Sequence, residues 1–313
     1  MNEIEKFIAE HKLITLDGAM ATELEKKGMN LNDPLWSARV LAENPKAIKE
    51  VHLSYLKAGA KIIITSSYQA TIEGFMKRGY SRDQAQMLMI KSMDLAKEAR
   101  REYMTISGIK QGCDVKIAAS IGPYGAFLAD GSEYRGQYDT SLEALEAFHE
   151  ERISILSKEN PDLLACETIP CLIEAKAIVN VLKKYPEHRA WMSFSCRDSS
   201  HISDGEAISE CAKWLDEHPQ IVAIGINCTA PEYVENLIRE IRKGSQKPIV
   251  VYPNHGETYD AVNKVWLNLT EHKDFMSYVE DWINAGAKII GGCCRTSPEE
   301  IEKIALKLSQ DDR

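Results

Sequence analysis

Three of the eight cysteines in this chain have a spacing that could hold a metal ion. Gly291-Gly292-Cys293-Cys294 follows an apolar, strand-like run, and Cys228 follows a second such run. If the two runs are parallel strands of one sheet, the three sulfur atoms lie at the same edge. Three thiolates with an open fourth position are typical of a catalytic zinc site, although thiolate-rich zinc sites are more often closed and structural. We therefore predict a metal site on Cys228, Cys293 and Cys294.

The competing interpretation is that these cysteines are buried small hydrophobic residues, the usual role of a free cysteine. That role fits the cysteines that occur singly in expected strands, helices or turns, which are Cys113, Cys166, Cys171, Cys196 and Cys211. It fits the adjacent pair poorly, because the two preceding glycines offer little side-chain packing. Zinc is the favoured metal, since it accepts all-sulfur ligation and needs no redox partner.

Short β-branched runs alternate with amphipathic segments along the chain. The runs predict eight strands, at Leu13–Leu16, Lys61–Thr65, Lys116–Ser120, Asp162–Glu167, Ala190–Cys196, Ile221–Cys228, Pro248–Pro253 and Ala287–Gly292. The segments between them predict helices, for example at Pro45–Lys57, Asp83–Tyr103, Leu142–Lys158, Ala207–Glu217 and Pro231–Arg242. Such alternation is typical of βαβ units, and eight of them favour a closed barrel over an open sheet. We predict a single-domain α/β protein, a (β/α)8 TIM barrel over residues 1–313.

A six-residue pattern occurs twice and fits this arrangement. Ala58-Gly59-Ala60-Lys61-Ile62-Ile63 returns as Ala285-Gly286-Ala287-Lys288-Ile289-Ile290. In both copies we expect the glycine to end a helix, so that the chain turns directly into a buried strand.

The barrel places the active site at the C-terminal ends of its strands. The residues at those ends are polar or metal-binding: Asp17, Thr65-Ser66-Ser67, Ser120, Glu167-Thr168, Cys196-Arg197, Asn227-Cys228, Asn254-His255 and Cys293-Cys294. Long loops are expected at residues 18–43, 121–140 and 254–270, where barrels place lids and substrate contacts.

Composition narrows the class of partner. The formal net charge is −9, from 38 basic and 47 acidic residues, and no basic stripe is present, so nucleic acid is not an expected partner. No apolar run approaches the length of a membrane span, and the first twelve residues lack the apolar core of a signal peptide. Sparse cysteines suit a reducing compartment, and we expect a cytoplasmic protein. The glycine-containing loops match no nucleotide-binding motif.

Two carboxylates and a tryptophan are further candidates for substrate contacts. Asp17, which ends the first expected strand, would either cap a following helix or hold an ammonium group at the barrel mouth. Glu167, at the end of an apolar strand, would be costly to bury without a cation or donors, which favours a functional role. Trp36 taken alone is a core residue, but near the mouth its ring would attract a cationic ligand.

With these residues in view, the chain resembles the homocysteine S-methyltransferases, particularly the small enzymes that use S-methylmethionine. The resemblance runs nearly end to end, through Leu16–Leu24, Asn32–Ser37, Thr65–Ala70, Ser120–Gly125, Leu128–Tyr134, Glu167-Thr168, Gly225–Cys228 and Gly291–Arg295.

The resemblance implies a (β/α)8 barrel with one zinc ion per chain on Cys228, Cys293 and Cys294. It implies that Asp17 and Glu167 hold the amino group of homocysteine and that the homocysteine carboxylate docks at Gly18. We include Asn227 among the candidate substrate-binding residues. Trp36 matches a tryptophan on the methyl-donor side of the related betaine-dependent enzymes.

The methyl donor follows from where the chain departs from its relatives. Tyr68 and Gln69 stand where the betaine enzymes carry an aromatic pair, and no folate or cobalamin module is present. This elimination favours a sulfonium donor, S-methylmethionine first and S-adenosylmethionine second. The alternatives are a zinc-dependent barrel hydrolase and a non-catalytic zinc- or thiol-binding protein. We expect a monomer or a weak homo-oligomer.

Overall fold

The computed structural model describes residues 2–31, 35, 37–108, 115–255, 258–260, 265–267 and 275–311. Its centre is a parallel sheet of eight strands in the order β1-β10-β7-β6-β5-β4-β3-β2. The strands are β1 (Ile14–Thr15), β2 (Ile62–Ile64), β3 (Lys116–Ile121), β4 (Leu163–Ile169), β5 (Ala190–Phe194), β6 (Ile221–Asn227), β7 (Ile249–Tyr252) and β10 (Ile289–Ile290). A parallel bridge between Leu16 and Ile62 joins β1 to β2, so the sheet closes on itself. All eight predicted strands are confirmed.

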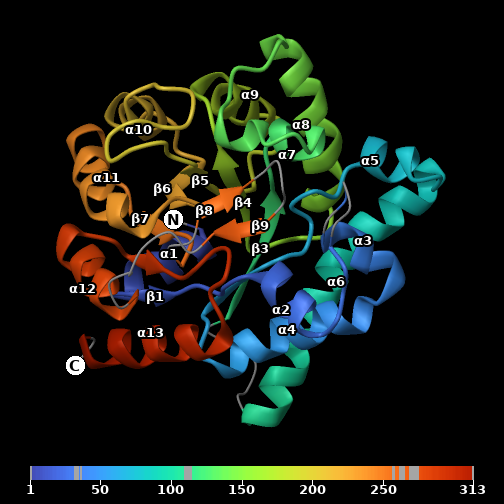
Figure 1. The fold of residues 1–313 in the computed structure, drawn as a ribbon, viewed down its shortest axis with the longest axis horizontal. Coiled ribbons are helices and arrows are strands. Elements are labelled where there is room, and N and C mark those ends of the chain that lie inside the picture. Colours follow the sequence, from blue (N-terminus) through green and yellow to red (C-terminus); the bar gives the residue numbers. More distant parts are fainter. Residues whose placement is uncertain are drawn as a thin grey trace.

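Helices surround the strands on the outside (Figure 1). They are α2 (Met20–Lys26), α3 (Ser37–Glu43), α4 (Pro45–Lys57), α5 (Ile72–Lys77), α6 (Arg82–Ser107), α8 (Leu142–Ser157), α9 (Leu172–Leu182), α10 (Ile208–Asp216), α11 (Pro231–Gly244), α12 (Phe275–Ala285) and α13 (Pro298–Asp311). Local sequence accounts for several of their starts. Asn44 caps α4, with Pro45 in the first turn, and Ser81 forms a capping box with Gln84 at α6. The (β/α)8 barrel predicted from the sequence is confirmed.

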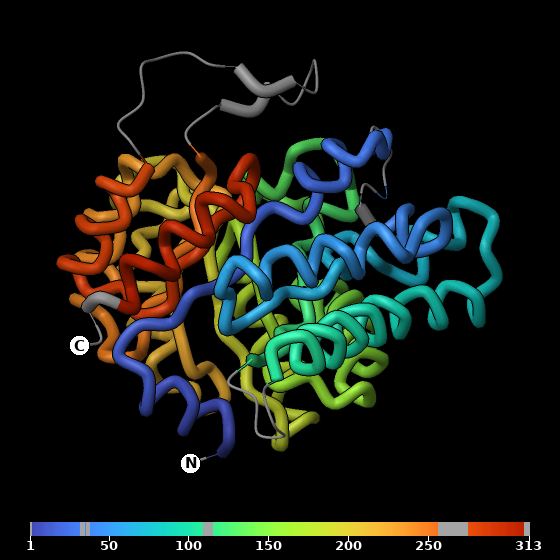
Figure 2. The backbone as a smooth tube through the Cα atoms, turned by 90° about the horizontal axis from the view of Figure 1, so that it is seen from below, coloured from blue at the N-terminus to red at the C-terminus, as the bar shows by residue number. Residues whose placement is uncertain are grey.

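The N-terminal helix α1 (Glu3–Glu10) closes the lower end of the barrel, below the strands (Figure 2). Its apolar face is buried together with the inward-pointing side chains of the strands. This inner cluster includes Ile4, Phe7, Ile8, Ile14, Leu16, Ile62, Leu163, Trp191, Val250, Tyr252 and Ile289. A second, larger cluster lies between the strands and the outer helices. The barrel interior is therefore a packed core that leaves only the opposite end, the barrel mouth, for a site.

The three expected long loops contain regular structure, and in this respect the sequence-based prediction is wrong. Residues 18–43 include α2 and α3. Ile121 still belongs to β3, and the segment after it holds α7 (Tyr124–Leu128) and a 3-10 turn, η1 (Ser132–Tyr134). Residues 254–270 contain an antiparallel pair, β8 (Thr258–Asp260) and β9 (Val265–Leu267). Short elements satisfy the backbone N–H and C=O groups that an irregular loop over the barrel end would leave unpaired.

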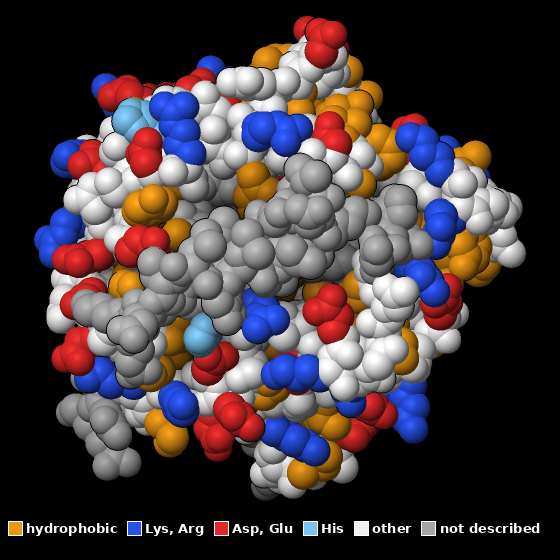
Figure 3. Space-filling view, viewed as in Figure 1, with side chains coloured by type: hydrophobic (Ala, Val, Ile, Leu, Met, Phe, Trp, Pro, Cys, Tyr) orange, Lys and Arg blue, Asp and Glu red, His pale blue; other side chains and the backbone are white. Residues whose placement is uncertain are grey.

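Charged side chains of both signs are mixed on the face of the molecule that Figure 3 shows. This mixture is in keeping with a modest net charge of −9. None of the helices in the described part of the chain combines the length and apolar character that a membrane crossing needs.

The repeated Ala-Gly-Ala-Lys-Ile-Ile pattern turns as expected in both copies. Helices α4 and α12 end at Lys57 and Ala285, and Gly59 and Gly286 adopt φ values of +100° and +109°. Residues with a Cβ atom rarely adopt this conformation. At Gly59 space is limiting as well, because an added Cβ would lie 2.7 Å from the Cβ atom of Ala305.

We predict that Gly59→Ala lowers the free energy of unfolding by about 2–4 kcal/mol, from backbone strain plus overpacking against α13. Gly79→Ala is the matched control, because Gly79 has φ +88° with nothing within 4 Å of an added Cβ. The control should lose only the strain contribution, about 1–2 kcal/mol. Urea unfolding of both variants measures the difference, and equal losses would contradict the crowding at Ala305.

Candidate active site

The barrel mouth brings together the three cysteines that the sequence singled out. Cys228 follows β6, and Cys293 and Cys294 follow β10; we call these three residues the thiol cluster. Their sulfur atoms all lie within 4.8 Å of one another. Strand β7 lies between β6 and β10 and holds both sides, since Cys228 N–H donates to Tyr252 O (3.3 Å) and Cys293 N–H to Pro253 O (2.7 Å).

The structure shows Cys228 and Cys293 joined as a disulfide, with Cα atoms 5.6 Å apart, and Cys294 outside this disulfide. The sequence-based prediction of a shared metal site did not include this disulfide. The physical reason is proximity: thiols placed close enough to share a metal ion are close enough to oxidise together.

The donor set fits a zinc ion once the disulfide is reduced. Four-coordinate zinc binds sulfur at about 2.3 Å, which places neighbouring sulfurs roughly 3.8 Å apart, within the spread seen here. Three thiolates supply the soft ligands that zinc accepts.

The two glycines before the cysteines are explained by close packing at the ends of β1 and β10. Gly292 N–H donates to the carbonyl oxygen of Asp17 at 3.1 Å. An added Cβ would lie 2.5 Å from that same oxygen at Gly291, and 2.2 Å from the Thr296 side chain at Gly292. Side chains at either position would push the thiol cluster away from β1.

The two candidate carboxylates are buried at the mouth. Asp17 is 4% exposed, and its Oδ2 accepts a hydrogen bond from Ile64 N–H at 2.8 Å. Burial raises the pKa of Asp17 well above its ordinary value, and the charge of Glu167 raises it further. Glu167 is 6% exposed and accepts a hydrogen bond from the Ser120 hydroxyl. Burial raises the pKa of Glu167 to about 7, although hydrogen bonds from Ser120 and Tyr252 favour its charged form.

Gly18 lies where the chain turns from β1 towards α2. A Cβ atom there would lie 2.9 Å from both Thr296 O and the Tyr55 ring, so only glycine fits. The neighbouring N–H groups of Asp17 and Ala19 donate to Ile62 O and Thr296 O, each at 3.1 Å. Within the described part of the chain the Gly18 N–H has no such acceptor, which leaves a donor available to an anionic group.

Asn227 braces the ends of β4, β5 and β6. Its Oδ1 accepts hydrogen bonds from Thr168 N–H (2.7 Å) and the Ser193 hydroxyl (2.8 Å), and its Nδ2 donates to Thr168 Oγ1 (2.7 Å). Thr168 and Cys228 have φ values of +58° and +48°, which are uncommon for residues with a side chain. The observed contacts of Asn227 are with the protein, and direct substrate binding by Asn227 stays a prediction.

Sequence reasoning did not single out Ser193 and Tyr252, which complete this network. The Tyr252 hydroxyl lies 2.7 Å from Ser193 Oγ and accepts from Trp191 Nε1 at 3.0 Å. It also hydrogen-bonds to Glu167. The available signal was a polar residue within an otherwise apolar strand, at a position that points into the barrel.

A buried charged group on α8 supports the mouth from outside the barrel. Arg152, 2% exposed, donates to Gly122 O through Nη2 and to Tyr68 O through Nη1 (3.2 Å). Its Nη2 also lies 3.2 Å from His149 Nδ1, and His149 Nε2 lies 2.8 Å from Glu174 Oε1. Burial lowers the pKa of His149, so the neutral ring accepts from arginine and donates to glutamate. This network joins the segments that follow β2 and β3.

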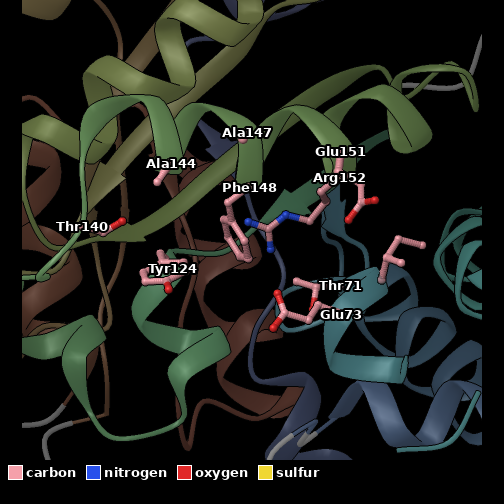
Figure 4. A pocket seen from close by; sticks show the side chains of 10 residues that line it. Thr71, Glu73, Tyr124, Thr140, Ala144, Ala147, Phe148, Glu151 and Arg152 are labelled. Carbon is pink, nitrogen blue, oxygen red and sulfur yellow. The ribbon is translucent and has the colours of Figure 1, made fainter. Parts of the chain in front are cut away.

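Arg152 also borders a cavity of about 380 Å³ outside the barrel. Figure 4 shows Arg152 and Phe148 reaching from α8 towards Thr71 and Glu73 at the start of α5. Tyr124 lines the same cavity and packs edge-on against Phe148, with ring centroids 5.0 Å apart. The thiol cluster and the buried carboxylates do not line it. Tyr124 is therefore part of an outer aromatic cluster rather than of the barrel mouth.

Of the two residues Trp36 and Gln69, which the sequence relates to the methyl-donor side, the structure describes only Gln69. Trp36 lies outside the described residues. Gln69 donates from Nε2 to Ala126 O at 3.0 Å, so it ties the segment after β2 to α7.

Three cysteine sulfur atoms and two buried carboxylates at the mouth of a (β/α)8 barrel define an enzyme-like site at the usual position for this fold. A model of the homocysteine S-methyltransferase family matches residues 14–308. The chain is 52% identical over 306 residues to homocysteine S-methyltransferase of Bacillus subtilis, covering 97% of each. The chain therefore belongs to the homocysteine S-methyltransferase family of enzymes.

Solved structures agree. The metallated form of the homocysteine methyltransferase from Escherichia coli superimposes with a TM-score of 0.87 at 45% identity, over 98% of this chain and 100% of that one. Its oxidized form gives a TM-score of 0.88 at 46% identity, over 99% and 100%. The backbone of the present chain thus resembles both forms to a similar degree.

We predict that Glu167→Gln stabilises the ligand-free protein, in a pH-dependent way. Below pH 4.5 the Glu167 carboxyl is protonated in both folded and unfolded states, so its ionisation costs nothing. As the pH rises through 4.5 to about 7, folding must either retain the proton or bury a charge. Removing that cost should raise the free energy of unfolding at pH 8 by up to about 3 kcal/mol.

Urea unfolding at pH 4.5 and pH 8 measures this effect. Glu143→Gln, at an exposed position on α8, is the control for the same chemical change. A stabilisation that is equal at both pH values would contradict the raised pKa of Glu167.

Proposed function

We propose that this enzyme transfers a methyl group from a sulfonium donor, with S-methylmethionine preferred, to the thiolate of L-homocysteine. The observation that carries the proposal is the thiol cluster, three sulfur atoms within 4.8 Å at the barrel mouth, beside two buried carboxylates. Membership of the homocysteine S-methyltransferase family supports the acceptor.

Reduced Cys228, Cys293 and Cys294 would hold one zinc ion per chain. A thiol with a pKa near 8.5 is mostly protonated at neutral pH, and zinc, when bound, supplies the chemistry that keeps the homocysteine thiol deprotonated. The ligand thiolates themselves require a reducing environment, which favours the cytoplasm as the working compartment.

The carboxylates and the turn at Gly18 supply the groups that an amino acid needs. We assign the homocysteine ammonium to Asp17 and Glu167, because both are buried without a basic side chain hydrogen-bonded to them among the described residues. The ammonium would favour their charged forms and offset the cost of burial. The homocysteine carboxylate would then accept from the Gly18 N–H.

The transfer needs little further machinery. The homocysteine sulfur forms a bond to the donor methyl carbon as the methyl–sulfonium bond breaks, and its electron pair goes to the departing thioether. With S-methylmethionine both products are methionine. Positioning of the two sulfurs in line supplies much of the acceleration, and the Asn227 and Arg152 networks hold the segments that surround them.

A barrel hydrolase with metal-bound water is the alternative chemistry. Such sites commonly combine histidine and carboxylate ligands, whereas the potential metal cluster found among the described residues has sulfur atoms alone. A closed structural zinc site would need a fourth protein ligand, and the described residues add none to these three. Both observations favour methyl transfer to a substrate thiol.

We predict that the zinc-loaded, reduced protein uses S-methylmethionine in preference to S-adenosylmethionine and does not use betaine. Gln69 stands where the betaine enzymes carry an aromatic residue, and its side-chain amide hydrogen-bonds to Ala126 O. Homocysteine is supplied with equal concentrations of the two sulfonium donors, and with betaine separately, while methionine and the demethylated donors are measured. Efficient betaine turnover would overturn the donor assignment, and turnover of an ester by water alone would favour the hydrolase.

We predict that Cys228→Ala, Cys293→Ala and Cys294→Ala each lose the bound zinc and the methyl transfer together. Removing one thiolate leaves two protein ligands, too few to hold the ion tightly. Cys211→Ala is the control, because Cys211 is a buried free thiol on the outer helix α10. Metal analysis of the reduced proteins gives the zinc content. Full activity of a zinc-free preparation would refute the proposed role of zinc.

A further inference from the structure

A half-buried carboxylate, Glu133, lies in a turn that is fixed over the barrel mouth. Glu133 belongs to η1, and its carbonyl oxygen accepts a hydrogen bond from the hydroxyl of Ser195, which directly follows β5, at 2.7 Å. Asp130 Oδ1 accepts from Ser132 N–H at 2.9 Å at the start of the turn. Helix α7 packs against it so closely that a Cβ on Gly125 would lie 2.4 Å from Glu133 N. The Glu133 backbone is therefore held in one place.

One oxygen of the Glu133 carboxylate lacks the partner that a buried oxygen needs. Its Oε2 is buried and has no hydrogen-bond partner among the described residues. Burial raises the pKa of Glu133 to about 7, and the opposing effect of Arg135 is the smallest contribution. Arg135 is itself largely exposed and lies 3.9 Å from Asp130. A rigid, buried acceptor without a cation is costly in the free protein, which points to a cation supplied by a ligand.

Tyr68 is close enough to two carboxylates to be affected by both charges. The phenol of half-buried Tyr68 hydrogen-bonds to the Thr168 side chain, and the charges of Glu133 and Glu167 both raise its pKa. By contrast, neither glutamate is among the charges that shift the pKa of the other. Arg152 fixes the Tyr68 carbonyl, and Gly122 leaves room for the Tyr68 ring, because a Cβ there would lie 2.8 Å from it. Two carboxylates that do not shift the pKa of each other thus both act on Tyr68.

We propose that Glu133 binds the α-ammonium group of the methyl donor, across Tyr68 from the homocysteine ammonium at Glu167. This inference rests on the proposed function and names the residue that recognises its donor.

The donor carries two positive charges, and they behave differently in the reaction. The sulfonium charge disappears as the methyl group leaves, so a carboxylate in contact with it would stabilise the ground state over the transition state and slow the reaction. The ammonium keeps its charge throughout, so a carboxylate bound to it lowers the donor KM without lowering kcat. Glu133 is therefore matched to the ammonium, and the sulfonium is left to uncharged surroundings such as the Tyr68 ring.

The test is a pair of isosteric variants, each of which is expected to raise the KM of a different substrate. Glu133→Gln should raise the KM for S-methylmethionine by a factor on the order of ten to a hundred, the size expected for losing a buried charged partner, with kcat and the homocysteine KM little changed. Glu167→Gln should raise the homocysteine KM instead. Glu143→Gln, an exposed position ten residues beyond Glu133, should change neither.

A donor analogue without the amino group identifies which charge Glu133 meets. Dimethylsulfoniopropionate keeps the sulfonium and lacks the ammonium, so it should inhibit the wild-type enzyme and Glu133→Gln with the same inhibition constant. A larger inhibition constant in the variant would place Glu133 at the sulfonium and overturn the inference. The inference would also be overturned if Glu133→Gln raised only the homocysteine KM, or raised the KM of both substrates equally. It would likewise be overturned if the variant changed neither KM.

The wild-type enzyme separates this inference from the proposed function. If wild-type protein loaded with zinc fails to methylate homocysteine from S-methylmethionine, the proposed function itself is wrong. If it succeeds while Glu133→Gln behaves like Glu143→Gln, only the role of Glu133 is wrong. Retained secondary structure and zinc content in Glu133→Gln exclude misfolding as the cause of any loss.

Discussion

The site depends on the parallel pairing of the first strand of the barrel with the last. The register Ile14 to Ile289 and Thr15 to Ile290 brings the carboxylate of Asp17 and the thiol cluster to one edge, although nearly the whole chain separates them in sequence. The hydrogen bond from Gly292 N–H to Asp17 O continues this pairing past the strand ends. An additional carbon atom at Gly291 would collide with that oxygen. Barrel closure and assembly of the site are therefore the same structural event.

Closure alone would give a stable barrel, yet the mouth contains features that reduce stability. Asp17, Glu133 and Glu167 are carboxyl groups whose pKa burial raises, and Thr168 and Cys228 adopt positive φ values. The hydrogen bond that Asn227 accepts from Thr168, and those that Ser120 and Ile64 donate to Glu167 and Asp17, oppose part of this cost. They leave Asp17 and Glu167 without a hydrogen-bonded basic side chain among the described residues. Pre-organised charge that awaits a ligand is characteristic of a functional site. Stability is concentrated instead in the inner and outer apolar clusters.

The strands and helices of the barrel could be predicted from the sequence because the spacing of apolar residues indicates which side chains are buried. All eight strands, and helices such as α4 and α8, lie within a few residues of their predicted positions. The thiol cluster could be predicted because parallel strands end at one edge. The positions of η1 and α7 could not, since no periodic pattern marks such short elements. Glu133 was likewise not recognised: only the fold of η1 over β5 reveals that one oxygen of its carboxylate is buried. The Cys228–Cys293 disulfide depends on side-chain distances that spacing does not give.

The charge balance of the mouth bears on turnover as well as on recognition. Three thiolates with a divalent zinc ion would carry one negative charge, and buried carboxylates add to it. Two basic side chains among the described residues form contacts elsewhere: Arg152 with backbone carbonyls, and His255 with Glu300. In the proposed reaction, S-methylmethionine would enter such a mouth with a net positive charge, whereas the methionine that leaves would be a neutral zwitterion. The electrostatic attraction that favours donor binding would thus be weakened by the reaction itself, which would favour product release.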